Sequence, residues 1–217
     1  VDALLPSTMN RISLPREESE FVLVSSSSDT QPGMQFLFNK STRKLSALGL
    51  VRPQINEKQM SKKSFLRIKA RDGMEIPTYL TLPRNSSGKN LPLIVMVHGG
   101  PYVRGGHWNW NPQTQFLASR GYAVIEPDFR GSVGYGKKLF QAGWKQWGLK
   151  MQDDLDDVRQ WAIDQSYADP GRVCIAGASY GGYAALMGLI RNPELYRCGI
   201  SWVGVSDINL LYDVAWS

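Results

Sequence analysis

Nearly continuous apolar runs mark three segments in the central part of the chain as buried β-strands. They cover residues 91–97, 122–125 and 173–176. A strand that is apolar on both faces is typical of a parallel sheet whose two sides are both covered. Between residues 151 and 162, apolar positions recur every three or four residues, which predicts an amphipathic helix. Strands that alternate with helices in this way predict an α/β fold.

A β-hairpin is predicted just before the first of these strands. Residues 65–70 and 77–82 alternate between apolar and polar side chains, and the turn between them contains Asp72-Gly73. Asp-Gly is a favoured pair for a tight turn between antiparallel strands. A strand-like run at 199–205 predicts one further strand near the end of the chain.

The first 50 residues differ in composition from the rest, because they are rich in Ser, Thr, Asn, Gln and charged side chains. Strand-like runs at 21–24, 34–38 and 44–50 are bounded by turn formers, and the last two are candidates for a hairpin. A sheet this small cannot bury both of its faces alone and needs a neighbouring unit. Residues 51–63 are polar and are interpreted as a linker to a second unit, residues 64–217.

Composition excludes several classes of protein. The 217 residues are 42% hydrophobic and 20% charged, which is a globular balance. The net charge of +6 comes from scattered basic residues that form no stripe, so nucleic-acid binding is not expected. No apolar run approaches the roughly 20 residues of a membrane span. Residues 1–6 lack a signal-peptide pattern, which favours the cytoplasm, but without a starting Met the chain is expected to be processed, trimmed or cut from something larger.

No metal or cofactor site is predicted. Four aspartates gather near the start of the helix at 151–162, but they lack the alternating spacing and turn glycine of an ion-binding loop. They suit the positive end of a helix instead. Two cysteines, Cys174 and Cys198, are too few for a disulfide scaffold, and we expect both to be buried core thiols rather than a disulfide or metal pair.

The clearest chemical signal is a Gly-x-Ser-x-Gly motif at a strand-to-helix turn. The strand at 172–176 runs into Gly-Ala-Ser-Tyr-Gly-Gly at 177–182, and an apolar helical run follows at 183–190. Such a turn strains the central Ser179 and pushes its hydroxyl out of the sheet edge. Strand and helix then approach without a side-chain clash because of three glycines: Gly177, Gly181 and Gly182. In this context the motif predicts a nucleophile elbow, against the alternative of a glycine-rich turn with an idle serine.

A second glycine motif supports this prediction. The strand at 91–97 ends in His98-Gly99-Gly100-Pro101. Where a nucleophile elbow of this kind occurs, the oxyanion hole takes one backbone amide from the residue after the nucleophile and one from the loop after an earlier strand. The backbone amides of Tyr180 and Gly100 are therefore the candidate donors, with His98 and Gly99 shaping the loop. The alternative is that this segment is only a turn.

Together these motifs resemble the catalytic domain of the prolyl oligopeptidase family of serine peptidases, most of all its acylaminoacyl-peptidase and dipeptidyl-aminopeptidase-like members. The segments that carry the resemblance are His98–Pro101, Phe116–Tyr122, Asp128–Ser132, Gly134–Gly136 and Gly177–Tyr183. The resemblance implies an α/β-hydrolase domain after a β-propeller, with residues 1–50 as a remnant of the last blade. It also implies cleavage of short peptides through an acyl-enzyme on Ser179.

A serine nucleophile needs a histidine base oriented by a carboxylate. In this fold the chain order is Ser, then the acid, then His. Both histidines, His98 and His107, precede Ser179, and neither is expected to reach it as the base. The candidates for the acid of the triad among residues after the serine are Glu194, Asp207 and Asp213. We expect instead that the chain is a segment of a larger peptidase whose Asp and His follow Ser217.

Aromatic residues after the glycine loop are candidates for a substrate pocket, with core packing as the alternative: Tyr102, Trp108 and Trp110. Two competing functions remain open at this stage. An esterase or lipase-like enzyme can use the same fold and elbow. A non-catalytic hydrolase-like binding module would fit the missing base if the chain were complete. Substrates are expected to be short peptides, and the sequence leaves the oligomeric state open.

Overall fold

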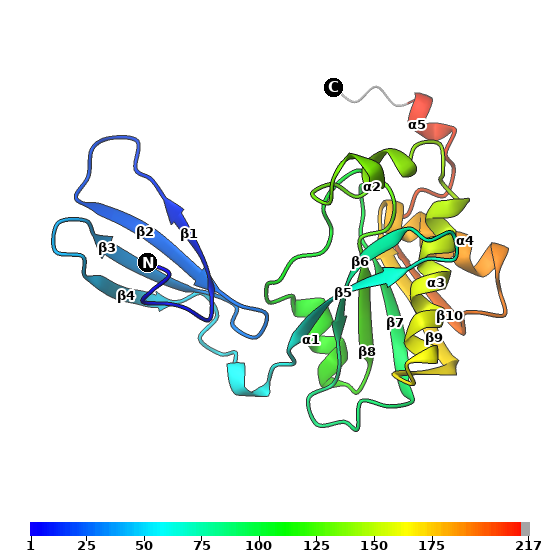
Figure 1. Ribbon diagram of the computed structural model, residues 1–217, viewed down its shortest axis with the longest axis horizontal. Helices are drawn as coiled ribbons and strands as arrows, with labels where there is room; N and C mark the ends of the chain where they lie inside the picture. The colour runs from blue at the N-terminus through cyan, green and yellow to red at the C-terminus, as the bar shows by residue number, and fades with distance from the viewer. Residues whose placement is uncertain (214–217) are drawn as a thin grey trace.

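The computed structural model describes residues 1–213 and contains two β-sheets (Figure 1). The N-terminal sheet is antiparallel with strand order β1-β2-β3-β4, formed by Met9–Ser13, Phe21–Ser27, Met34–Asn39 and Leu45–Leu50. The three strand-like runs of the sequence are confirmed. Strand β1 was not predicted, because its sequence, Met-Asn-Arg-Ile-Ser, is mostly polar and largely exposed.

The larger sheet has the order β10-β9-β7-β8-β6-β5. Its strands are β5 (Lys63–Lys69), β6 (Glu75–Thr81), β7 (Leu91–Val97), β8 (Ala123–Pro127), β9 (Ala168–Ala178) and β10 (Cys198–Trp202). Strands β10, β9, β7 and β8 are parallel, whereas β5 and β6 form an antiparallel hairpin beside β8. This mixed sheet with its helices confirms the predicted α/β fold class and the predicted hairpin.

The helices of the described residues are α1 (Pro112–Ser119), α2 (Lys137–Ala142), α3 (Lys150–Asp164), α4 (Tyr180–Arg191) and α5 (Leu210–Asp213). Helices α1, α3 and α4 pack against strands of the larger sheet, whereas α5 projects away from it (Figure 1). The apolar stripe of α3 is buried as its spacing predicts, and α3 and α4 both pack against β9. Helices α1 and α2 were not predicted, since both are short. No helix in the described part of the chain has the length and apolar character needed to cross a bilayer.

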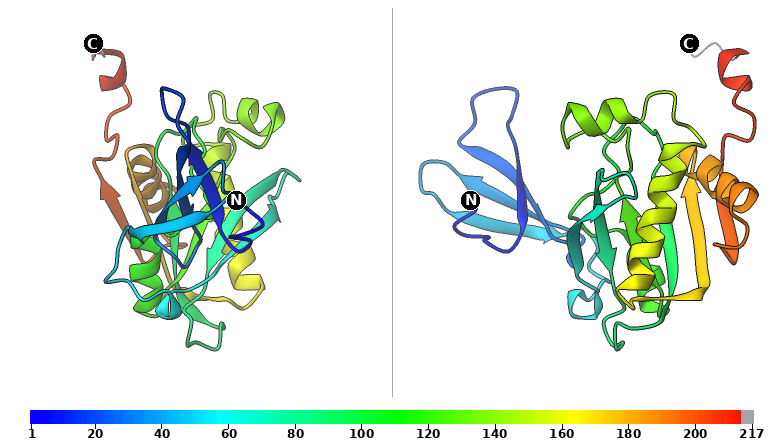
Figure 2. Two further views of the ribbon diagram at one scale, coloured as in Figure 1. Left: turned by 90° about the vertical axis from the view of Figure 1, so that its left-hand side faces the viewer. Right: turned by 45° about the vertical axis from the view of Figure 1, so that its right-hand side comes forward.

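The two sheets meet at a buried polar junction. The right-hand view of Figure 2 shows them side by side, joined through the segment that carries the short 3₁₀ helix η1 (Glu57–Gln59). The Lys63 backbone amide donates to Asp29 Oδ2 at 2.7 Å. Gln115 Nε2, on α1, donates to the carbonyls of Asp29 at 3.0 Å and Ser61 at 2.7 Å. The end of the predicted linker is therefore packed and hydrogen-bonded.

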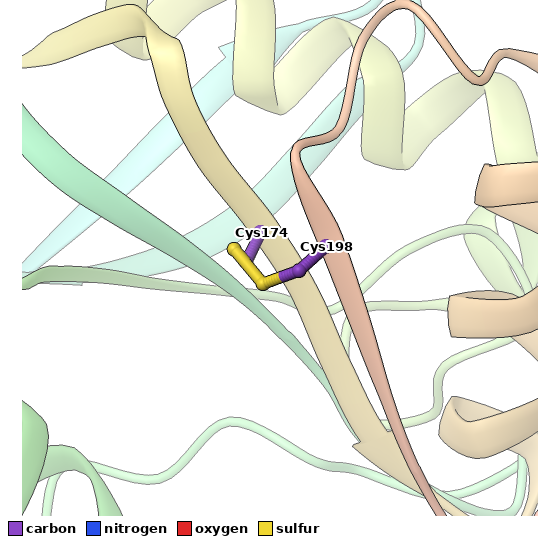
Figure 3. Close-up of a disulfide and its surroundings, with 2 residues drawn as sticks. All are labelled: Cys174 and Cys198. Carbon is purple, nitrogen blue, oxygen red and sulfur yellow. A yellow bond between two sulfur atoms is a disulfide. The ribbon is translucent and has the colours of Figure 1, made fainter.

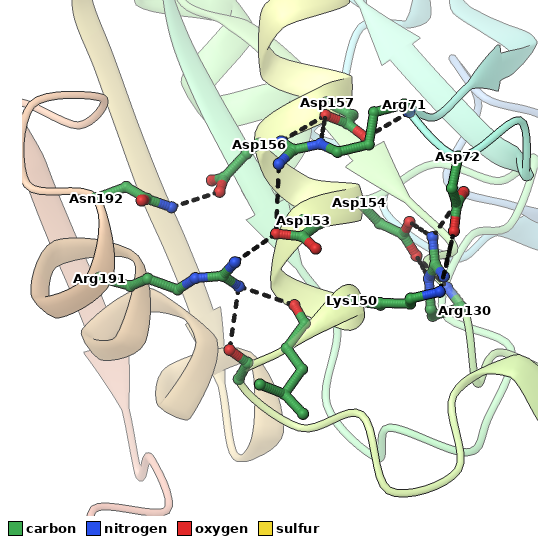
Figure 4. A network of polar contacts seen from close by, with 12 residues as sticks. Arg71, Asp72, Arg130, Lys150, Asp153, Asp154, Asp156, Asp157, Arg191 and Asn192 are labelled. Carbon is green, nitrogen blue, oxygen red and sulfur yellow. Dashed lines mark hydrogen bonds and ion pairs between the residues drawn. The ribbon is translucent and has the colours of Figure 1, made fainter.

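The acidic residues of α3 point to different partners around the helix (Figure 4). Asp154 pairs with Arg130 at 2.6 Å, and Asp153 pairs with Arg191 at 2.7 Å. Asp157 Oδ1 pairs with Arg71 at 2.7 Å. Only Asp153 lies in the first turn of the helix, so ion pairs with neighbouring elements explain this cluster better than the helix dipole does.

The expectation of separate buried thiols is wrong, because Cys174 and Cys198 form a disulfide (Figure 3). The parallel register sets Cys198 of β10 directly opposite Cys174 of β9, with 4.7 Å between the Cα atoms. That spacing lies within the range of roughly 4.4–6.8 Å that a disulfide spans. Cys174 is half-buried and Cys198 is exposed, on the edge strand of the described sheet. The pairing depends on strand register, which the spacing in the sequence does not reveal.

Reduction of this disulfide should destabilise the fold. A crosslink restricts the unfolded chain, and its loss typically lowers the free energy of unfolding by about 2–4 kcal/mol. Urea unfolding measured with and without a reducing agent checks this. The Cys174→Ser/Cys198→Ser double variant is the control, because its unfolding curve should not respond to the reductant. Identical curves for the parent chain under both conditions would show that the crosslink contributes nothing.

Candidate active site

Ser179 occupies the turn between the end of β9 and the start of α4. Its backbone lies at φ 56° and ψ −119°, a strained conformation for a residue with a side chain. The Ser179 amide donates to the Trp202 carbonyl of β10 at 2.9 Å, and its carbonyl accepts from the Tyr183 amide at 3.0 Å. Ser179 is exposed. The predicted strain and exposure of the serine are both confirmed.

The glycines around Ser179 are required by close backbone contacts. A Cβ on either Gly177 or Gly181 would overlap the carbonyl oxygen of Val97, the last residue of β7. A Cβ on Gly182 would lie 2.6 Å from the Cα of Gly204. Real Cβ atoms do not approach backbone atoms this closely, so the turn tolerates only glycine there. The predicted reason for the glycine spacing is confirmed.

The His98–Pro101 segment lies against this turn. A Cβ on Gly99 would stand 3.4 Å from the Ser179 Cβ and 3.1 Å from the Ala178 carbonyl oxygen. Gly100 has φ 119°, a conformation that favours glycine. Tyr180 is the first residue of α4, where a backbone amide has no partner within the helix. The fold thus brings together the two glycine motifs that the sequence singled out.

The two ring nitrogens of His98 contact groups other than Ser179, which does not suit a role as the catalytic base. Its Nδ1 lies 2.7 Å from the Gly99 carbonyl, which can only accept, so this nitrogen carries the proton. Its Nε2 lies 3.0 Å from the Ser132 hydroxyl. Burial lowers the pKa of the imidazole, so the ring is neutral near pH 7. Both ring nitrogens are therefore occupied by partners other than Ser179.

A small cavity of about 210 Å³ lies at the carboxyl ends of the parallel strands. It is lined by backbone and side chains from the glycine loop, the turn before Ser179, β8 and β10, among them His98, Gly99, Gly177, Ala178 and Trp202. Crevices at the carboxyl ends of parallel strands are where ligands bind in open α/β sheets. The elbow and the loop therefore stand at the position where this architecture places its chemistry.

Comparison with known proteins assigns the chain to a family. The family profile described as "Prolyl oligopeptidase family" matches residues 108–216. Dipeptidyl aminopeptidase BIII of Pseudoxanthomonas mexicana is 38% identical over 196 residues, which cover 87% of this chain and 28% of that protein. The chain belongs to the prolyl oligopeptidase family. Dipeptidyl peptidase family member 6 of Caenorhabditis elegans is 32% identical and covers 93% of this chain and 30% of its own length.

Solved structures of two peptidases share the fold. A puromycin-hydrolyzing peptidase of Mycobacterium tuberculosis superposes with a TM-score of 0.80 at 24% identity, over 92% of this chain and 32% of that one. Acylaminoacyl peptidase of Pyrococcus horikoshii gives 0.73 at 26% identity, over 90% and 33%. The chain spans under a third of the length of the curated relatives named above.

The aromatic pocket candidates lie in different places in this prolyl oligopeptidase family chain. Trp110 Nε1 contacts Met60 Sδ at 3.2 Å, under the guanidinium of Arg52. Trp108 lines a cavity at the junction with the N-terminal sheet. Neither contact involves the elbow, so the pocket role of these two residues stays a prediction. Tyr102 is 40% exposed and lies two residues after Gly100, and its pocket role also stays a prediction.

Among the described side chains, no hydrogen bond or ion pair joins the remaining triad candidates to Ser179. His107 is exposed, and its carbonyl accepts from Lys63 Nζ at 3.3 Å. Glu194 and Asp207 are exposed, and Asp207 accepts from the Asn209 amide at 2.8 Å. The side chain of Asp213 lies outside the described residues.

Two residues near the site were not singled out from the sequence. Asp128 and Ser132 are fully buried, and both contact the loop that begins at His98. They belong to the Asp128–Ser132 segment, which was noted only as a family motif. The sequence feature that could have singled out Asp128 is its position just after an apolar strand.

Proposed function

We propose that this chain carries the nucleophile and oxyanion parts of a serine peptidase site. The observation that supports this most is Ser179, strained and exposed at the start of α4 beside a glycine loop. In the proposed reaction, Ser179 Oγ attacks the peptide carbonyl while its proton passes to a histidine base. The base returns that proton to the leaving amine as the C–N bond breaks, and water then hydrolyses the acyl-enzyme.

The backbone amides of Tyr180 and Gly100 are the proposed oxyanion donors. Tyr180 begins α4, so its amide and the positive end of the helix face negative charge that develops at the attacked carbonyl. Gly100 follows Gly99, which packs against Ser179. Loss of one such donor typically costs about 2.7–4 kcal/mol of transition-state stabilisation.

The base is not expected among the residues of this chain. No histidine follows Ser179, and His98 is neutral and engaged with Gly99 and Ser132. We therefore propose that the catalytic acid and the histidine base follow Ser217 in a longer protein. Without a base the hydroxyl is not activated, so residues 1–217 alone should show no hydrolysis beyond trace.

The N-terminal sheet is proposed to be the last blade of a β-propeller, with residues 51–63 as the return to the hydrolase. Propeller blades are four-stranded antiparallel sheets, as this one is. Solved relatives also match across 90% or more of the chain, so the likeness includes the N-terminal part. A propeller blade before the hydrolase favours a peptidase over an esterase on the same fold.

A labelling and substrate panel tests this function. In the full-length protein, a fluorophosphonate should label Ser179, and aminoacyl, dipeptidyl and acylaminoacyl p-nitroanilides should separate the three peptidase activities. Hydrolysis of p-nitrophenyl esters without any p-nitroanilide turnover would favour an esterase instead. Absence of labelling would favour a non-catalytic module. Turnover by residues 1–217 alone, abolished by Ser179→Ala, would contradict the proposed origin of the base.

A further inference from the structure

The Asp128–Ser132 segment, which follows β8, has no role in the site described so far. It lies against the loop at 98–106 that carries the proposed oxyanion donor. Asp128, Phe129 and Ser132 are each fully buried. Their contacts with that loop carry the inference.

Asp128 binds the C-terminal end of the loop at 98–106. Its Oδ1 accepts the backbone amides of Gly105 at 2.8 Å and Gly106 at 2.9 Å. Its Oδ2 accepts the hydroxyl of Tyr135 at 2.7 Å. Burial and this hydrogen bond raise the pKa of Tyr135, so the phenol remains a donor. Hydrogen bonds to an ionised carboxylate are stronger than those between neutral groups.

The same segment fixes the near end of the loop through His98. The rings of His98 and Phe129 stack with their centroids 4.4 Å apart. Ser132 Oγ lies 3.0 Å from His98 Nε2, and Asp128 Oδ1 lies 3.5 Å from that nitrogen. His98 Nδ1 in turn donates to the Gly99 carbonyl, one residue before Gly100. Segment 128–132 therefore holds the loop on both sides of the proposed donor.

Steric contacts show how tightly the loop is folded onto this segment. A Cβ on Gly105 would overlap the His98 ring, and a Cβ on Gly106 would overlap Asp128 Oδ2. The segment is itself anchored elsewhere, because Arg130 pairs with Asp154 of α3 at 2.6 Å and with Asp72 at 2.9 Å. The loop is thus packed against a segment that ion pairs connect to α3 and to the β5–β6 turn.

We propose that Asp128 is a positioning residue that holds the Gly100 amide where the oxyanion forms. This rests on the proposed function of Ser179 and Gly100. Donors that are held in place before the reaction need no reorganisation when charge develops, and this is the source of their effect. Asp128 holds the loop through the backbone amides of Gly105 and Gly106 and touches no reacting atom, so its loss should lower kcat and leave KM nearly unchanged.

Two measurements on the full-length protein test this, with Asp128→Asn as the variant and Asp156→Asn as the matched control. Asp156 is also a buried aspartate that accepts a tyrosine hydroxyl, that of Tyr196 at 2.6 Å, but it lies on α3 away from the loop. Asp128→Asn should reduce kcat for the best p-nitroanilide by roughly 10²-fold, the cost of misplacing a catalytic group by about 1 Å. Asp156→Asn should leave kcat within about twofold, although it lowers stability.

Amide hydrogen exchange separates this proposal from the proposed function, because it needs no activity. Asp128→Asn should speed exchange in peptides covering residues 99–106, whereas Asp156→Asn should not. Equal kcat for the two variants, or unchanged exchange of the loop in Asp128→Asn, would overturn the positioning role. If the parent protein hydrolyses nothing, the proposed function fails, and loop exchange alone then decides whether Asp128 holds the loop. Tyr135→Phe, which removes one donor to Asp128, should give a smaller change of the same kind.

Discussion

Ser179→Ala in the full-length protein should lower kcat by about 10⁶-fold, the cost of removing the serine from a catalytic triad. The hydroxyl is the only group at the elbow that forms the acyl-enzyme in the proposed reaction. Residual activity would come from the oxyanion donors and binding alone, and KM should change little. Initial rates over a range of p-nitroanilide concentrations measure both constants.

Ser119→Ala is a suitable control for this prediction. Ser119 is an exposed residue at the end of α1, and its hydroxyl donates to the Phe116 carbonyl at 2.7 Å. Its loss should leave kcat unchanged. If Ser179→Ala keeps more than a few per cent of the parent kcat, Ser179 is not the nucleophile, whatever the strain at its backbone.

Gly181→Ala should both destabilise the domain and abolish fluorophosphonate labelling. The added Cβ would overlap the Val97 carbonyl oxygen and stand 3.2 Å from that of His98. Either β7 or α4 would have to shift, and these elements position the two proposed oxyanion amides. Overpacking of this kind typically costs about 1–3 kcal/mol, occasionally more. Urea unfolding and the rate of labelling measure the two effects.

Gly171→Ala is the matched control for this effect. The Cβ would find its nearest neighbour, Asp169 Oδ1, at 3.4 Å, an ordinary contact. Stability should therefore stay the same or rise slightly, because alanine restricts the unfolded chain more than glycine does. If Gly181→Ala and Gly171→Ala unfold at the same urea concentration, the close approach of α4 and β7 does not require glycine.

Strong periodic patterns made most of the larger sheet predictable. The apolar runs at β7, β8 and β9 and the stripe of α3 are long enough for burial to dominate the local preference. Short elements escaped prediction, among them β1 and α2. In those segments few residues are buried, so the pattern carries little information about the element.

The disulfide and the ion pairs between distant segments could not be predicted, because they depend on sheet order and register. The disulfide exists because β10 pairs in parallel with β9 and sets Cys198 opposite Cys174. The ion pair of Arg130 with Asp154 likewise needs the loop after β8 to lie beside α3. Nothing in the local sequence states which strand lies next to which.

The turn at Ser179 could be derived from the sequence, because its strand, glycines, serine and helix are contiguous and their geometry is local. The position of both histidines before Ser179 could also be read directly from the sequence. The contacts of Asp128 and Ser132 with residues 98–106 became visible only in the three-dimensional arrangement. These contacts arise because the parallel sheet brings the carboxyl ends of β7, β8 and β9 to one edge, where residues far apart in the chain become neighbours.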